Sequence, residues 1–131
     1  MVLAERKPTM EKAIRQLFRP LEENGLKQIS FLGLVTSSDS QVSFFGYYLG
    51  KPYQSNQLME ETDFDTDCIE QFYGEAVKAI RNAKEFDRNQ LNIIKVYADG
   101  RFSLRCAAYS EDYFDIEEQW LKELMDHSPS A

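Results

Sequence analysis

Two neighbouring segments constrain the fold most, because they predict β-strands that are apolar on both faces. The runs "KQISFLGLVT" and "QVSFFGYYLG" flank the polar tetrapeptide "SSDS", which has the length of a hairpin connection. Side chains alternate between the two faces of the strand pair. One face holds Phe31, Val35, Phe44 and Tyr48, and the other face holds Leu32, Leu34, Phe45 and Tyr47. One face can enter the core, so the other needs a cover or a binding partner.

Two further segments show the apolar periodicity of helices. Residues 69–83 carry apolar side chains at i, i+3, i+4, i+7, i+8 and i+11, which predicts a helix. Residues 8–23 show similar spacing, with Gly25 just beyond as a cap. Pro20 removes a backbone donor, so we expect it to kink this helix or end it early.

A second hairpin follows in "LNIIKVYADGRFSLRCAAY", where Asp99-Gly100 is the favoured pair for a two-residue turn. That turn pairs Tyr97 with Phe102 across the strands and Ile93 with Cys106. It also puts Leu91, Leu104 and Ala108 on one core face. Lys95 interrupts this face, so we expect it near an edge with its amine in water.

These elements predict a single α+β domain over residues 1–131. A closing helix is expected from Phe114, Ile116, Trp120, Leu121 and Leu124, and "KPYQSNQL" is read as a short strand or a loop. The order is therefore α-β-β-(β)-α-β-β-α, with four or five antiparallel strands and helices on one face. We expect a core that includes Ile69, Phe72, Val77, Ile80, Leu104 and Trp120.

The acidic residues are concentrated in two blocks. The chain has a net charge of -7, and residues 60–75 hold seven carboxylates and no Lys or Arg. Residues 111–131 hold seven more carboxylates and a single Lys. This balance argues against direct binding of nucleic acid, which needs clustered cations. If the two blocks lie near one another, their field would speed encounter with a cationic partner.

The first block resembles the start of a calcium-binding loop, but its later positions do not fit one. Asp63, Asp65 and Asp67 imitate the start of such a loop, but Cys68 stands where the turn needs Gly, and Gly74 stands where a bidentate Glu is needed. Helix capping explains the block better, with Asp67 before the helix and Glu70 three residues later. We expect no metal and no cofactor.

The sequence favours a binding protein over an enzyme. His127 is the only histidine and lies in a polar tail, so no nucleophile has its usual base. Cys68 and Cys106 are far apart, which favours two reduced thiols. No apolar run is long enough to span a membrane and "MVLAERKPTM" lacks the apolar stretch of a secretion signal, so we expect a cytoplasmic protein.

The candidate partner-binding residues are carboxylates beyond those needed for capping, together with aromatic residues of the first hairpin. Aromatic residues at a sheet surface are more often core, although they also serve as anchors where a partner docks. The candidates are Glu60, Glu61, Asp63, Asp65, Glu111, Asp112, Asp115, Phe45 and Tyr47. An adaptor or regulatory binding module fits the same features, and a small acidic enzyme ranks third.

Three segments together resemble the YezG-like immunity proteins: the aromatic hairpin "VSFFGYY", the acidic "FDTDCIEQFYGEAVKAIR", and the hairpin "NIIKVYADGRFSLRCAAY" followed by acids. The resemblance covers element order over roughly residues 10–125. It implies a bacterial antitoxin without catalysis, similar in role to the immunity proteins of contact-dependent growth inhibition. Its partner would be a cognate basic toxin domain, often a nuclease, whose active site or substrate access it blocks. The resemblance names no site residue, and the oligomeric state stays open.

Overall fold

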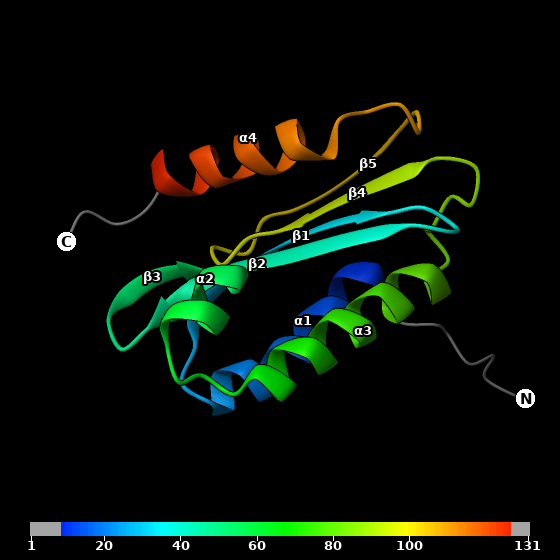
Figure 1. Cartoon of the computed structure of the whole chain (residues 1–131). Helices are drawn as coiled ribbons and strands as arrows, with labels where there is room; N and C mark the ends of the chain where they lie inside the picture. The colour runs from blue at the N-terminus through cyan, green and yellow to red at the C-terminus, as the bar shows by residue number, and fades with distance from the viewer. Residues whose placement is uncertain (1–8, 127–131) are drawn as a thin grey trace, which may run out of the picture.

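The computed structural model describes residues 9–126 and has an α+β architecture, as the sequence predicts (Figure 1). Its antiparallel sheet has five strands in the order β3-β2-β1-β4-β5. The strands are β1 (Lys27–Val35), β2 (Ser40–Tyr48), β3 (Lys51–Gln54), β4 (Leu91–Val96) and β5 (Phe102–Ala107). The helices described are α1 (Met10–Glu23), α2 (Ser55–Glu61), α3 (Thr66–Asn82) and α4 (Tyr113–Asp126).

Helices α1 and α3 cover one face of the sheet and form the larger core with it (Figure 1). Phe72 of α3 lies near the centre of this core, with ring centroids 5.4 Å from Phe44, 5.7 Å from Phe31 and 6.0 Å from Phe18. Perpendicular and tilted ring pairs of this kind add to the stabilisation that comes from apolar burial. The predicted second helix therefore holds the main core together.

Helix α4 covers the opposite face, which corrects the expectation that all helices share one side (Figure 1). Trp120 is fully buried there with Ile116, against strand residues that point to the face opposite α1 and α3. Those buried strand residues are Leu32, Leu34, Phe45, Leu91 and Ile93. Both faces of the first hairpin are apolar, as predicted, and a sheet of this kind is stable only when each face is covered.

Four of the six predicted core residues are buried and two are only partly buried. Ile69, Phe72, Ile80 and Trp120 are each at most 4% exposed. Val77 and Leu104 pack against the larger core from its margin. Helix α1 continues through Pro20 to Glu23, rather than ending early.

The second hairpin is shifted by one residue from the predicted register. Val96 pairs with Phe102, and the Tyr97 N–H donates to the Arg101 carbonyl at 2.9 Å, so the loop holds three residues. Gly100 has φ of +101°, which suits the left-handed position of a three-residue loop. Because a one-residue slip reverses the faces, Leu104 packs on the α1/α3 side and not beside Leu91.

The segment "KPYQSNQL" is part strand and part helix. Residues Lys51–Gln54 form β3, which pairs with β2 from Phe45 to Tyr48, and Ser55 begins α2. Strand β3 is therefore much shorter than its neighbour and leaves the first half of β2 at the sheet edge. In the part of the chain that the structure describes, no helix combines the length and apolar character needed to cross a membrane.

Candidate functional site

The first acidic block lies at the end of α2 and the start of α3. Glu60 and Glu61 are exposed. Asp63 accepts a hydrogen bond of 3.0 Å from the Tyr48 hydroxyl, and this bond raises the pKa of Tyr48 above its usual value. Glu60 and Glu61 are thus free to meet a partner, whereas Asp63 also anchors a side chain of β2.

Asp65 caps α3, which corrects the prediction that Asp67 does so. Its carboxylate accepts hydrogen bonds from the backbone N–H groups of Asp67 at 3.0 Å and Cys68 at 3.4 Å. An aspartate at this position satisfies donors that the first helical turn leaves unpaired. Asp65 is therefore a structural residue as well as a candidate for binding.

The second acidic block leads into α4 and continues along its outer side. Asp112 accepts a hydrogen bond of 2.9 Å from the Phe114 N–H, so it orders the start of the helix. Glu111, Asp115 and Glu118 are exposed. Of the predicted residues in this block, Glu111 and Asp115 are the two without a capping role.

The two acidic blocks lie in different layers of the molecule. The first is at the α2–α3 corner, and the second is on α4 across the sheet (Figure 1). The fold therefore does not merge them into one surface. Each must be considered as a separate candidate for a cationic partner.

Of the two predicted aromatic candidates of the first hairpin, Phe45 is buried and Tyr47 is partly buried. Phe45 is only 8% exposed and packs edge-on against Tyr47, with ring centroids 6.0 Å apart. Both belong to the core beneath α4, where Tyr47 is partly buried. Helix α4 supplies the cover that their face needs, so Phe45 is a core residue.

Two exposed apolar side chains on α4 were not predicted as candidates. Phe114 is 71% exposed and Met125 is 62% exposed, while Leu121 between them is half-buried. These residues stand at i, i+7 and i+11, so they follow one line along the helix, and Glu118 shares that line. Sequence reasoning assigned Phe114 to the buried face with Ile116. Phe114 and Ile116 are two residues apart, so they point to different sides of a helix, and this spacing could have shown that Phe114 is exposed.

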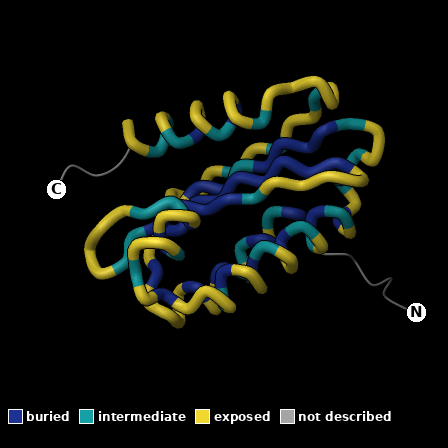
Figure 2. Tube along the Cα trace, viewed as in Figure 1, coloured by how far each residue is buried: buried dark blue, intermediate teal, exposed yellow. Residues whose placement is uncertain are grey.

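No ion pair of residues 9–126 involves the carboxylates around this line, although Lys122 stands four residues after Glu118 on the same helix. The ion pairs of this range join Arg15 to Glu11, Arg19 to Glu23, Lys95 to Glu123 and Arg101 to Asp99. Exposed carboxylates that pair with nothing contribute little to stability. Glu111, Asp115 and Glu118, together with Phe114 and Met125, form what we call the α4 surface. Figure 2 shows the exposed outer side of the helix.

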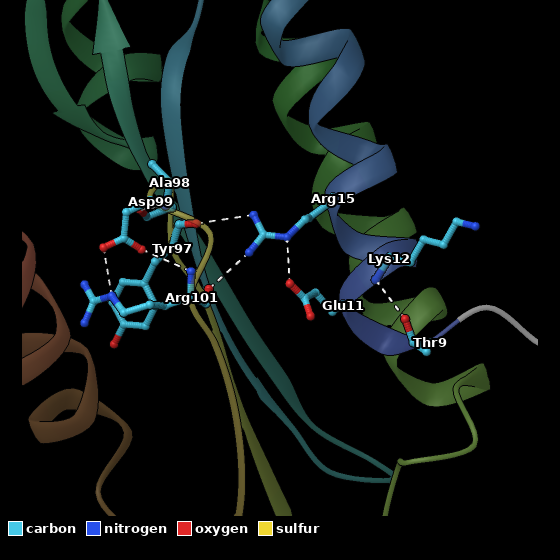
Figure 3. Close-up of polar contacts among 9 residues, drawn as sticks. Thr9, Glu11, Lys12, Arg15, Tyr97, Ala98, Asp99 and Arg101 are labelled. Carbon is cyan, nitrogen blue, oxygen red and sulfur yellow. Dashed lines mark hydrogen bonds and ion pairs between the residues drawn. The ribbon is translucent and has the colours of Figure 1, made fainter.

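A different polar cluster ties the second hairpin to α1. Arg15 donates to the carbonyl oxygens of Tyr97 at 3.3 Å and Arg101 at 3.1 Å, and Glu11 orients its guanidinium at 2.9 Å (Figure 3). The guanidinium of Arg101 lies 4.2 Å from the ring centre of Tyr97. The guanidinium of Arg15 donates its hydrogen bonds to backbone carbonyls and to Glu11, so this cluster is structural.

The same hairpin is tied to α4 on the other face of the sheet. Lys95 lies 3.6 Å from Glu123, which also accepts a hydrogen bond of 2.7 Å from the Tyr97 hydroxyl. Lys95 lies on β4, one strand in from the edge, and its side chain is mostly buried. The amine of Lys95 therefore forms an ion pair with Glu123, whereas the sequence predicts that it reaches water.

The two thiols of the described range are unpaired, and no cluster of metal ligands accompanies them there. Cys68 and Cys106 are free thiols, and burial, followed by a nearby aspartate in each case, raises the pKa of both. A raised pKa disfavours the nucleophilic thiolate. Residues 9–126 contain no group of three His, Cys, Asp or Glu side chains able to hold a metal. His127 lies outside the described residues.

Neither a scan against models of protein families nor a search of curated proteins returned a match for this chain.

Proposed function

We propose that this protein is an immunity protein that binds and neutralises a cationic toxin domain of the nuclease class. The observation that carries the proposal is the α4 surface, where exposed Phe114 and Met125 lie among carboxylates without cationic partners. Phe and Met are enriched in protein interfaces relative to the rest of the protein surface. The surrounding charge selects a basic partner.

A nuclease is the class of toxin that this surface suits best. Its substrate cleft must carry Lys or Arg to hold phosphate groups, and those cations also attract carboxylates. An acidic inhibitor docked at the cleft would exclude RNA or DNA by charge and by volume. The protein would need no catalysis of its own, and it would act in the cytoplasm, where the toxin reaches nucleic acid.

The proposal predicts a toxin domain encoded beside this gene, and co-expression with that domain tests it. The Glu111→Lys, Asp115→Lys, Glu118→Lys triple variant should fail to protect cells, while its melting temperature stays within a few degrees of the parent. A matched variant, Glu60→Lys, Glu61→Lys, Glu75→Lys, changes the charge equally in the first acidic block, at the end of α2 and within α3. It should retain more protection. If both variants protect like the parent, charge does not direct binding and the proposal is wrong.

A further inference from the structure

The first half of β2 is a free sheet edge. Strand β3 pairs with β2 only from Phe45 to Tyr48, and no other described strand lies outside Ser40–Phe44. The Phe44 N–H points outward, since it donates to the Ser55 hydroxyl oxygen at 3.4 Å. Backbone groups alternate in direction along an antiparallel strand, so those of Ser40 and Val42 also point outward. Figure 2 shows the exposed start of this strand at the front of the sheet.

A groove of about 490 Å³ runs beside this edge, between β2 and α3. Its walls are Ser40, Gln41 and Val42 on the strand and Tyr73, Gly74 and Val77 on the helix. A Cβ at Gly74 would meet no atom within 4 Å, so the helix leaves open space there. The groove lies on the α3 side of the sheet, where Val42, Tyr73 and Val77 are partly buried.

Hydrogen bonds join neighbouring elements beyond each end of the groove. Arg81 of α3 donates to the carbonyl oxygens of Thr36 at 3.1 Å and Asp39 at 3.2 Å, and so joins the helix to the β1–β2 loop. At the other end Ser55 begins α2 and occupies the Phe44 N–H. The open edge between them measures about 13 Å at roughly 3.3 Å per residue. That length suits an extended segment of about four residues.

The α4 side of the same edge is anionic. Glu117 accepts hydrogen bonds from the side-chain amides of Gln41 at 2.5 Å and Gln54 at 2.6 Å. No Lys or Arg among the described residues pairs with it. Side chains of an added strand alternate between the two faces of the sheet. One set would meet the apolar groove wall, and the other would meet the Glu117 carboxylate.

We propose that the β2 edge takes an extended segment of the toxin, with apolar side chains on one face and Lys or Arg on the other. This inference rests on the proposed function for the identity of the partner. Main-chain hydrogen bonds to Ser40 and Val42 supply affinity, and the two unlike sides of the edge supply selectivity. The edge is a second point of attachment, distinct from the α4 surface.

An alternating Val/Lys hexapeptide with blocked termini is a direct probe that does not need the toxin. Titrated into the labelled full chain and followed by NMR, it should shift the amide signals of Ser40 and Val42. A block peptide with three Val followed by three Lys has the same charge and composition and should bind at least about tenfold more weakly, because strand addition depends on alternation. Equal binding of the two peptides, or no shift at this edge, overturns the inference.

Two variants test the edge, each with a matched control. Val42→Pro removes an N–H that points away from β1 and takes no part in the β1–β2 pairing. Its control is Cys106→Pro on the edge strand β5. The Arg101 carbonyl points toward β4, and because directions alternate along the strand, the Cys106 N–H points away from β4. Gly74→Arg fills the groove with a cation, and Gln71→Arg adds the same charge one turn earlier on α3, at an exposed residue that does not line the groove. Val42→Pro and Gly74→Arg should each weaken peptide binding at least about tenfold, and the controls should bind normally.

The same variants separate this inference from the proposed function. Cells that carry Gly74→Arg should lose protection against the toxin, whereas Gln71→Arg should protect. If Gly74→Arg protects fully and binds the peptide normally, the edge is not the attachment site, although the immunity function stands. If the parent protein binds the alternating peptide but protects against no toxin, the proposed function fails instead. Concentration-dependent dimerisation that Val42→Pro abolishes would assign the edge to a second copy of this chain and overturn the inference.

Discussion

The Tyr97 hydroxyl donates a hydrogen bond of 2.7 Å to Glu123 and so joins the end of β4 to α4. Its backbone carbonyl accepts from Arg15 of α1 on the opposite side of the sheet. One residue thus connects all three layers. Polar contacts therefore hold the loop end of the second hairpin between α1 and α4.

The contribution of Tyr97 to stability should depend on pH in the alkaline range. Burial, followed by the hydrogen bond to Glu123, raises the pKa of Tyr97 from 10.0 to about 12. Because the folded pKa is the higher one, the stabilisation is complete below pH 10.0 and is lost as pH rises toward about 12. Tyr97→Phe should therefore have a lower melting temperature than the parent at pH 7, and the gap should narrow above pH 10. A gap that stays constant to pH 12 would contradict this assignment.

Phe72 should be among the most sensitive core positions. It is 4% exposed and touches the rings of Phe18, Phe31 and Phe44. Phe72→Ala should lower the free energy of unfolding by about 3 to 5 kcal/mol, the range for buried aromatic truncations. Urea unfolding measures this directly. A loss below about 1 kcal/mol would mean that α3 does not pack on the sheet as described.

The two aspartates at the start of α3 should differ in their effect on stability. Asp65→Ala removes the cap and should destabilise the protein by about 1 kcal/mol. Asp67→Ala removes only a charge near the positive end of the helix and should change stability by less than about 0.5 kcal/mol. Thermal unfolding of the two variants under one buffer compares them. The reverse order would restore Asp67 as the cap.

Apolar parity predicted the faces of the first hairpin correctly but not what covers them. Leu32 and Leu34 are buried under α4, and Phe31 and Val35 under the other helices. Both groups are equally apolar, so the pattern shows that two covers are needed. It does not say on which side the closing helix docks, because that depends on contacts between distant segments.

Small local differences account for the other discrepancies. Asp99-Gly100 fits two-residue and three-residue loops alike, and the choice between them reverses the face of Leu104. Asp65 and Asp67 both precede the helix, and only the backbone geometry shows which carboxylate reaches the free N–H groups. On α4, Phe114 and Ile116 are both apolar, yet they differ by about 200° around the helix axis at 100° per residue.

The candidate site was predicted in part. The acidic character of Glu111 and Asp115 was visible in the charge distribution, and their exposure agrees with a surface role. Phe45 is a candidate in the sequence because its face needs a cover, and the pattern does not say whether α4 or a partner supplies that cover. Conversely, the exposure of Met125 depends on the orientation of α4 about its own axis, which places Trp120 in the core. Such an orientation is a property of tertiary packing.

The most direct test of the central claim is the rate at which the protein associates with the proposed cationic toxin as salt is varied. The parent rate should fall at least about tenfold between about 50 and 500 mM salt, since screening weakens attraction between separated charges. The Glu111→Lys, Asp115→Lys, Glu118→Lys variant should associate more slowly at low salt and show little further dependence on it. Equal rates and equal salt dependence for parent and variant would contradict the account.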